Sequence, residues 1–175
     1  EAGGHNGIEE TTTMVLIPML RQVIDIPIIA AGGIASGKAI YAALTLGADG
    51  VQIGSLFAVS KESSAHDNFK QSVFDAGDGQ TKLVLKSLVS VRLIKNEFFR
   101  KVEKAESEGA SREQLAVLLG KGRAKMGMFE GDTIDGELEI GQVSAMIDEL
   151  KPVQHIIDEL VDDFNKTALN KPNLI

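Results

Sequence analysis

Residues 28–37, with the sequence IIAAGGIASG, decide the fold of this chain. The apolar first half is typical of a buried parallel strand, and it runs directly into Gly32 and Gly33. Ser36 can cap a helix after the glycines, and small and apolar residues then recur at helical spacing as far as Gly47. A strand, a glycine turn and a helix in this order direct free backbone N–H groups at an anion such as a phosphate.

A second unit of the same kind follows at once. Residues 48–55, ADGVQIGS, predict another short strand that ends in Gly54 and Ser55. Because a right-handed crossover brings the ends of adjacent parallel strands to one sheet edge, we expect the two loops to form one anion site. Paired phosphate loops of this kind follow the last two strands of (β/α)₈ barrels. The alternative is that both are tight turns that bind no ligand. Two glycine loops in succession favour the interpretation that they bind a phosphate.

Composition restricts the class of protein. The chain has 175 residues, of which 43% are hydrophobic and 25% charged, enough for one domain with a core. A net charge of −7 argues against non-specific binding to nucleic acid, which needs a basic surface. Cysteine is absent, and the acidic residues lack a ligand spacing, so we expect no metal site. No apolar run reaches membrane length and no secretory signal is visible, so a cytoplasmic location is the default expectation.

The chain opens with EAGGHNG, which places His5 between glycines. Glycines let the backbone approach a flat ligand closely while the imidazole projects. Histidine titrates near neutral pH and can therefore move a proton. A lone loop histidine more often makes a structural hydrogen bond, but phosphate loops expected on the same face favour a catalytic role here. Such a loop normally follows a strand, so we expect a strand before Glu1, because two strands alone cannot close a barrel.

The remaining residues predict packing elements rather than chemistry. His66 is interpreted as a surface or packing residue on one of the expected helices, and residues 122–142 as a glycine-punctuated loop over a site. A helix over 153–168 is expected to bury the stripe Ile156, Ile157, Leu160, Val161 and Phe164. The other expected elements are helices over 18–23, 63–75, 96–108, 111–119 and 143–150 and a strand over 81–85.

Four motifs occur in order: EAGGHNG at 1–7, AAGGI at 30–34, LGADGVQIGS at 46–55, and the pairs Gly131-Asp132 and Gly141-Gln142. In this combination the chain resembles the nitronate monooxygenase family, formerly 2-nitropropane dioxygenase, which includes the FMN-dependent enoyl-ACP reductases. The resemblance covers nearly the whole chain and matches the C-terminal part of that family. It implies an α/β fold, namely the C-terminal part of an FMN-binding TIM (β/α)₈ barrel with a small, mostly helical segment.

The resemblance also implies roles for particular residues. His5 matches the histidine that serves as catalytic base toward nitroalkanes. FMN is the implied cofactor, and the residues implied to bind it are Gly3 and Gly4 near the ring, Gln52 on the flavin side, and Gly32, Gly33, Gly54 and Ser55 at the phosphate. Leu56 stands where family members often have arginine, so one positive contact is absent while the backbone N–H groups remain.

This interpretation divides the chain into three regions. Residues 1–60 are expected to form the last βα units of the barrel with the phosphate loops. Residues 61–142 are expected to form the mostly helical segment and an active-site loop, and residues 143–175 are expected to be C-terminal helices that pack back on the barrel. A small-molecule substrate is expected, with no nucleic acid or membrane as partner, and a homodimer is the assembly to test.

Other functions stay open at this point. A reductase of the same family would take hydride from NAD(P)H to an enoyl thioester, and the two activities share their flavin loops. A non-flavin barrel that binds a sugar phosphate would not need the loop around His5. An incomplete barrel without a competent flavin site would expose the apolar faces of its strands.

Overall fold

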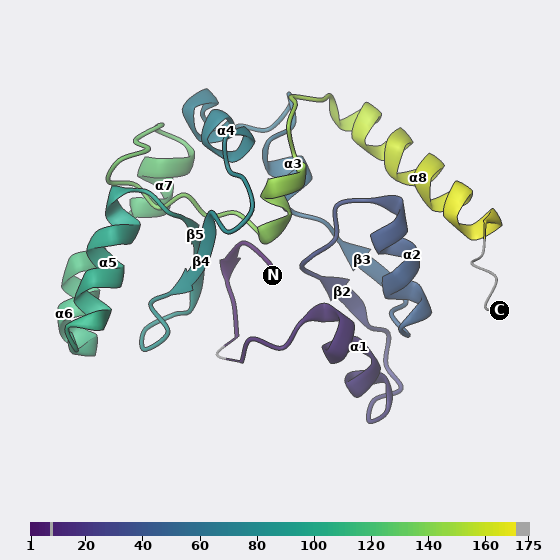
Figure 1. Cartoon of the computed structure of the whole chain (residues 1–175), viewed down its shortest axis with the longest axis horizontal. Helices are drawn as coiled ribbons and strands as arrows, with labels where there is room; N and C mark the ends of the chain where they lie inside the picture. The colour runs from purple at the N-terminus through teal and green to yellow at the C-terminus, as the bar shows by residue number, and fades with distance from the viewer. Residues whose placement is uncertain (8, 171–175) are drawn as a thin grey trace.

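The computed structural model describes residues 1–7 and 9–170. Figure 1 shows two groups of elements at opposite ends of the molecule, with the N-terminus between them. The elements in chain order are β1 (Gly4–His5), α1 (Thr13–Arg21), β2 (Ile29–Ala31), α2 (Gly37–Thr45), β3 (Gly50–Gln52), α3 (Ser55–Ala58), α4 (Asp67–Phe74), β4 (Thr81–Val84), β5 (Val91–Ile94), α5 (Glu97–Ser107), α6 (Arg112–Leu119), α7 (Arg123–Met128), the 3₁₀ helix η1 (Gln142–Met146) and α8 (Val153–Leu169).

The first group is the predicted pair of parallel strands with its helices. Strands β2 and β3 pair in parallel, with Ala30 opposite Val51, and α2 forms the crossover between them. The Ser36 hydroxyl caps α2 by accepting a hydrogen bond from the Ala39 N–H at 3.1 Å. Buried Ile17, Ile28, Ala30, Ile34, Ala43 and Ala48 form the core between α1, α2 and the strands. The strand–glycine–helix prediction is therefore confirmed for the first unit, and the strand predicted within residues 48–55 is present as β3.

The second group is built on an antiparallel sheet of order β1-β5-β4. The predicted strand near 81–85 is present as β4, but its partner β5 was not predicted. Helices α5 and α6 cover this sheet, and the core between them is formed by apolar residues that include Leu93, Phe98, Phe99 and Leu115. Strand β1 joins this sheet through the pairs Gly4–Arg92 and His5–Val91. The loop around His5 therefore connects the antiparallel sheet to the parallel pair.

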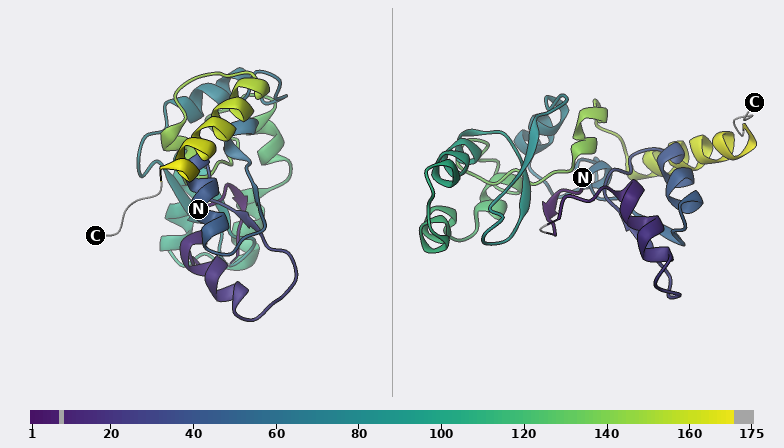
Figure 2. Two further views of the ribbon diagram at one scale, coloured as in Figure 1. Left: turned by 90° about the vertical axis from the view of Figure 1, so that its right-hand side faces the viewer. Right: turned by 60° about the horizontal axis from the view of Figure 1, so that its bottom comes forward.

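Helix α8 packs on α2 in a close crossing that Figure 2 shows in its left view. A Cβ atom at Gly37 would lie 2.0 Å from the backbone nitrogen of Phe164, so only glycine fits there. The Asp163 carboxylate accepts a hydrogen bond from the Lys38 N–H at 2.9 Å, at the first turn of α2. The expected apolar stripe of α8 is only partly covered. Ile156 and Leu160 are buried, whereas Ile157 and Val161 are exposed.

Three helix predictions need correction. Helix α1 begins at Thr13 rather than at Pro18, because the Glu1 carboxylate accepts a hydrogen bond from the Thr13 N–H at 2.6 Å and satisfies the first turn. The predicted helix over 143–150 is only the short 3₁₀ helix η1. Residues 122–142 are not all loop, because α7 lies within them.

His66 lies at the start of its helix rather than within it. It is the N-cap of α4, and its Nδ1 accepts a hydrogen bond from the Asn68 N–H at 3.1 Å. Helix α4 therefore begins later than expected, and its Phe69 and Val73 are buried in the core.

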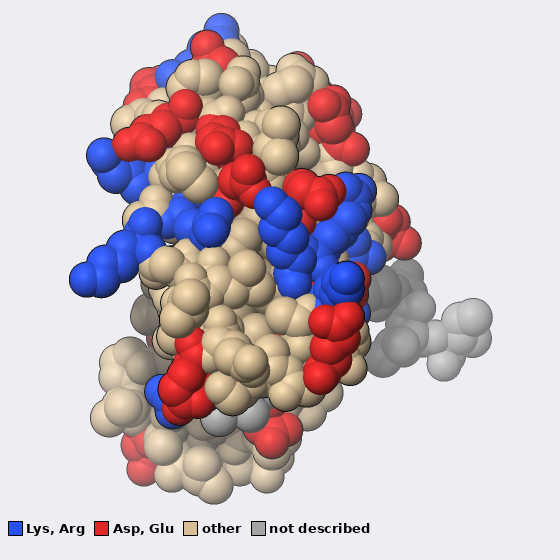
Figure 3. All heavy atoms as spheres, turned by 90° about the vertical axis from the view of Figure 1, so that its left-hand side faces the viewer, with Lys and Arg blue, Asp and Glu red and all other residues tan. Residues whose placement is uncertain are grey.

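The face formed by α5 and α6 carries mixed charge. Figure 3 shows basic and acidic side chains interspersed there, and Lys82–Glu103, Arg100–Glu97 and Lys101–Asp135 form ion pairs with about half-exposed side chains. Such pairs contribute little to stability, about 0–1 kcal/mol each, so this face is a solvated helix surface. Among residues 1–7 and 9–170, no helix is long and apolar enough to cross a membrane.

Candidate active site

The two glycine loops meet at one small hollow of about 80 Å³. Gly32 and Gly33 follow β2 with φ angles of +103° and +73°, a conformation that favours glycine. Gly54 and Ser55 follow β3 and open α3. Six of the eight predicted site residues line this hollow: Gly3, Gly32, Gly33, Gln52, Gly54 and Ser55. The parallel register of β2 and β3 brings them together, because it places both strand ends at one edge.

The backbone of these loops is free to bind an anion. In the described part of the chain, no backbone oxygen accepts a hydrogen bond from the N–H groups of Gly33, Ile34, Gly54 or Ser55. A Cβ at Gly54 would meet nothing within 4 Å, so the approach to this loop is open. Oriented free N–H groups around a hollow of this size suit a phosphate group. A whole cofactor needs roughly 300 Å³ or more, so the hollow would take only its phosphate end.

A larger, open hollow of about 460 Å³ adjoins the first one. The two share Glu1, Ala2 and Ala31 in their walls, and Asn6, Thr11 and Leu16 are among the residues that line the larger one. No lysine or arginine is among the described residues that line the smaller hollow. Leu56, at the position where relatives were expected to carry arginine, packs against the core formed by α4 and its neighbours.

The end of the 122–142 segment closes over the start of the chain. The Gly141 N–H donates a hydrogen bond to Ser55 Oγ at 3.1 Å, and the Gln142 N–H donates one to the Glu1 carbonyl at 3.0 Å. A Cβ at Gly3 would lie 2.6 Å from the Gly141 nitrogen, so these backbones touch. Because Ser55 Oγ accepts from Gly141, its hydroxyl hydrogen is free to donate to a ligand.

His5 does not line the phosphate hollow. It lies on β1 as an exposed residue at the edge of a separate hollow of about 200 Å³. The apolar part of this hollow comes from Leu85, Val89, Val91 and Leu119, and its charged part from Arg123, Glu137 and Glu139. An imidazole beside apolar walls and titratable groups is suited to proton transfer.

A fourth hollow, of about 220 Å³, lies between the phosphate hollow and the His5 hollow. It is lined by Gly3, Gly4, Gly54, Ser55, Ala58, Met128, Glu139 and Ile140. It shares Gly3, Gly54 and Ser55 with the phosphate hollow and Glu139 with the His5 hollow. Gly4 has a φ angle of +66°, and a Cβ there would lie 2.8 Å from Glu139 Oε2. The structure therefore links the predicted residues through a glutamate that the sequence analysis did not single out.

Buried Glu137 and partly buried Glu139 are the main residues that the sequence analysis missed. Burial, and secondarily the charge of Glu139, raise the pKa of Glu137 to about 7. Burial also raises the pKa of Glu139, while the positive charge of His5 opposes that rise. The alternation Glu-Leu-Glu-Ile over 137–140 was the available signal, because it places both carboxylates on one side of an extended segment.

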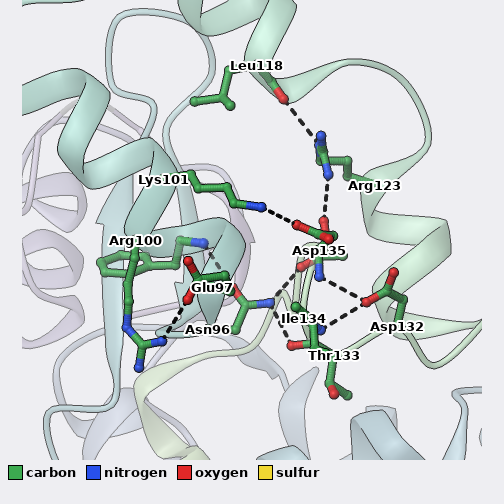
Figure 4. A network of polar contacts seen from close by, with 12 residues as sticks. Asn96, Glu97, Arg100, Lys101, Leu118, Arg123, Asp132, Thr133, Ile134 and Asp135 are labelled. Carbon is green, nitrogen blue, oxygen red and sulfur yellow. Dashed lines mark hydrogen bonds and ion pairs between the residues drawn. The ribbon is translucent and has the colours of Figure 1, made fainter.

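A network of polar contacts fixes residues 132–136, which directly precede this segment, to α5 and α7 (Figure 4). The Asn96 side-chain amide donates to the carbonyls of Thr133 and Gly136 at 3.0 and 2.8 Å. The Arg123 guanidinium donates to the carbonyls of Leu119 and Asp135, both at 2.7 Å, and lies over the ring of Phe98. Partly buried hydrogen bonds from a charged guanidinium hold the backbone at Asp135 firmly. The Glu137 N–H also donates to the Arg123 carbonyl at 3.0 Å, so the segment with the two glutamates is attached to α7.

The fold and this site together define a class: an α/β protein whose paired glycine loops follow two parallel strands, of the kind found in (β/α)₈ barrels. Comparison with known proteins supports this assignment to a class. The family model described as nitronate monooxygenase matches residues 1–163. A probable nitronate monooxygenase of Bacillus subtilis is 40% identical over 116 residues, which is 62% of this chain and 33% of that protein.

Solved structures are similar over almost the whole chain. FabK from Thermotoga maritima has a TM-score of 0.88 and 36% identity, covering 96% of this chain and 53% of that one. A nitroalkane oxidase from Streptomyces ansochromogenes has a TM-score of 0.73 and 28% identity, and the match covers 97% of this chain and 51% of that one.

The chain belongs to the nitronate monooxygenase family, a family of FMN-dependent oxidoreductases. Its parallel strands and their helices are part of a TIM (β/α)₈ barrel, as the resemblance implied. It spans about a third of the length of the curated relatives that it matches and about half of the similar structures.

Proposed function

We propose that this chain forms the phosphate-binding and proton-transfer part of an FMN-dependent enzyme that oxidises nitronates or nitroalkanes with oxygen. The observation that carries the proposal is the convergence of two glycine loops on one hollow with free backbone N–H groups. Such a hollow recognises a phosphate by its dipoles, without a basic side chain. When bound, FMN would supply the electron-transfer chemistry between substrate and oxygen.

Different residues of the chain would contact different parts of FMN. The N–H groups of Gly33 and Gly54 and the Ser55 hydroxyl would hold the phosphate. Gly3 and Gly4 would leave room beside the ring, and Gln52, exposed at the end of β3, would approach the flavin side.

His5 would remove the α-proton of a nitroalkane or orient a nitronate that is already formed. A small organic molecule is therefore the proposed substrate, and a homodimer is the proposed assembly, to be checked by sedimentation. The proposed location is cytoplasmic, which fractionation would check.

A charge substitution tests the phosphate loops. Gly54 has ordinary helical angles and open space around its Cα, so aspartate and asparagine fit there equally well. We expect Gly54→Asp to lower FMN affinity at least tenfold, because a carboxylate would face the phosphate, and Gly54→Asn to lower it far less. Equal affinities for the two variants, measured by flavin fluorescence, would mean that this loop does not hold the phosphate.

A pair of substrates tests His5. In His5→Gln, oxygen consumption with a neutral nitroalkane should fall at least a hundredfold, whereas a pre-formed nitronate needs no proton removed and should retain most of its rate. The flavin content of the variant is the control. Equal losses with both substrates would contradict the role as base.

A reductase of the same family is a second candidate, because FabK from Thermotoga maritima is 36% identical with a TM-score of 0.88. Oxidation of NAD(P)H in the presence of an enoyl thioester, without oxygen, would favour the reductase. Oxygen consumption with a nitronate and no NAD(P)H would favour the monooxygenase.

A further inference from the structure

We propose that the hollow beside His5 selects a substrate that carries a positively charged ammonium group next to an apolar part, and that the Glu137 carboxylate binds the ammonium. This inference rests on the proposed function, because it names the substrate class for the hollow in which His5 would act. It narrows that function to nitroalkanes that also carry a cationic group. None of the motifs that carried the family resemblance includes Glu137.

The hollow has the mixed walls that such an amphipathic molecule requires. Aliphatic side chains form one part of the wall: Leu85, Val89, Val91 and Leu119. The other part carries the charged or titratable side chains His5, Arg123, Glu137 and Glu139. A volume of about 200 Å³ suits a small organic molecule rather than a large one. A ligand that fills the hollow would therefore contact aliphatic side chains and carboxylates at the same time, beside the proposed base.

Glu137 is the carboxylate that lacks a partner inside the protein. The residue is only 8% exposed and lines the hollow, yet within residues 1–7 and 9–170 no hydrogen bond or ion pair engages its carboxylate. Burying a charged group without a partner is costly, and the polar groups buried in native proteins are hydrogen-bonded as a rule. Because Glu137 faces the hollow, a ligand placed there can supply the partner that the protein does not.

The backbone fixes the position of this carboxylate. The Glu137 N–H donates a hydrogen bond to the Arg123 carbonyl at 3.0 Å. A Cβ at Gly127 would lie 2.3 Å from the Glu137 carbonyl oxygen, so α7 packs directly on this residue. Two positions further on, Glu139 forms an antiparallel bridge with Leu93 of β5. Both carboxylates therefore line the hollow from a segment that is held by α7 and by the antiparallel sheet.

The charges around the hollow favour a cation. Among the described residues that line it, Arg123 is the one permanent cation, and its guanidinium donates to the Asp135 carbonyl at 2.7 Å (Figure 4) and lies over the Phe98 ring. Burial, and after it the charge of Glu139, raise the pKa of Glu137 to about 7 against the attraction of Arg123. Arg123 therefore does not neutralise this carboxylate. An ammonium would be attracted by two carboxylates, whereas the negative charge of a nitronate would be repelled by them.

The direct test compares three ligands of similar length: n-butylammonium, n-butanol and butyrate. Each is titrated into the purified protein as isolated, at about pH 8, where Glu137 is largely ionised. We expect butylammonium to bind at least tenfold more tightly than butanol, because only the cation gains from the carboxylates, and butyrate to bind most weakly. If Glu137 were instead a neutral hydrogen-bond donor, the alcohol would bind as tightly as the ammonium. Equal affinity for these two ligands overturns the proposal.

The binding must also be located in the hollow, because the chain has a net charge of −7 and could attract a cation elsewhere. The methyl groups that line the hollow report on this by NMR: those of Leu85, Val89, Val91 and Leu119. We expect butylammonium to shift these four sets of signals. Shifts confined to methyl groups outside the hollow would also overturn the proposal.

A matched pair of substitutions assigns the effect to Glu137. Glu137→Gln keeps the size of the side chain and removes its charge, so it should lower the affinity for butylammonium at least tenfold and change the affinity for butanol little. Glu106→Gln, the same change on α5 at a residue that does not line the hollow, should leave both affinities unchanged. An undiminished preference for the ammonium in Glu137→Gln contradicts the assignment. The comparison of ligands in the unsubstituted protein does not depend on the folding of either variant.

Kinetics distinguish this inference from the proposed function. The two substrates to compare are 1-nitrobutane and the analogue in which an ammonium group replaces its terminal methyl group. We expect kcat/KM to be at least tenfold higher for the ammonium compound, and Glu137→Gln to remove this preference. Turnover of neither compound would refute the proposed function, while the binding comparison would still decide the inference. Equal kcat/KM values, in a protein that turns over both compounds, would refute the inference alone.

Discussion

Gly3→Ala should disturb both the stability and the flavin affinity of this protein, because Gly3 is packed directly against backbone. An alanine Cβ would lie 2.6 Å from the nitrogen of Gly141 and 2.6 Å from the carbonyl carbon of Ile140. Backbone cannot rotate away as a side chain does, so the segment around Gly141 must move outward by about 1 Å to restore ordinary contact. The φ angle of Gly3 is not in the left-handed region, so the cost comes from the lack of space.

The expected magnitude follows from the contacts that would be strained. Overpacking of this kind costs about 1–3 kcal/mol. Two hydrogen bonds bridge the same interface, from Gly141 to Ser55 and from Gln142 to Glu1, and losing them would add about 0.5–1.5 kcal/mol each. The free energy of unfolding should therefore fall by about 2–6 kcal/mol. Because Ser55 belongs to the phosphate loop, FMN affinity should fall as well.

Gly7→Ala is the matched control, since Gly7 lies in the same loop and an added Cβ there would meet nothing within 4 Å. Urea unfolding of both variants should show a lower midpoint for Gly3→Ala at unchanged slope and a change of less than about 1 kcal/mol for Gly7→Ala. Equal midpoints for the two variants would refute the packing of residues 140–142 on the start of the chain.

Three further predictions concern stability. The raised pKa of Glu137 means that the folded state binds its proton more tightly than the unfolded state. The free energy of unfolding should therefore fall by about 1–2 kcal/mol as the pH rises from about 5 to 8. In Glu137→Gln, urea unfolding at several pH values should no longer show this fall. Asn96→Ala removes the N-cap of α5 and two hydrogen bonds to residues 133–136. It should lower the free energy of unfolding, measured with urea, by about 1–3 kcal/mol and should speed amide hydrogen exchange in residues 133–136. Gly37→Ala should separate α8 from α2 and expose α8 to limited proteolysis, whereas Gly77→Ala, in open space, should not.

Much of the barrel part was predictable because its signals are local. A capping serine, a glycine turn and an apolar run lie within ten residues of one another, and the structure confirms the strands and helix that they predict. The same holds for α6, where Ser111 and Gln114 form a reciprocal cap. Each of these features depends on hydrogen bonds between near neighbours in the chain.

The rest of the site depends on contacts between distant residues. Strand β5 pairs with β1 across more than eighty positions of sequence, and nothing in residues 91–94 indicates that partner. Glu139 lies beside Gly4 only because that pairing and the bridge to Leu93 bring the two residues together. The stripe on α8 was overestimated because helical spacing shows which residues share a face, and only the close crossing at Gly37 decides how much of that face is covered.

The central claim is that the two glycine loops bind the phosphate of FMN. The most direct measurement compares the dissociation constants of FMN and riboflavin, which differ only in the phosphate, for the purified protein. We predict that FMN binds at least a hundredfold more tightly and that Gly54→Asp removes most of this difference. Equal affinity for the two flavins, or no binding of either, would contradict the assignment of the loops.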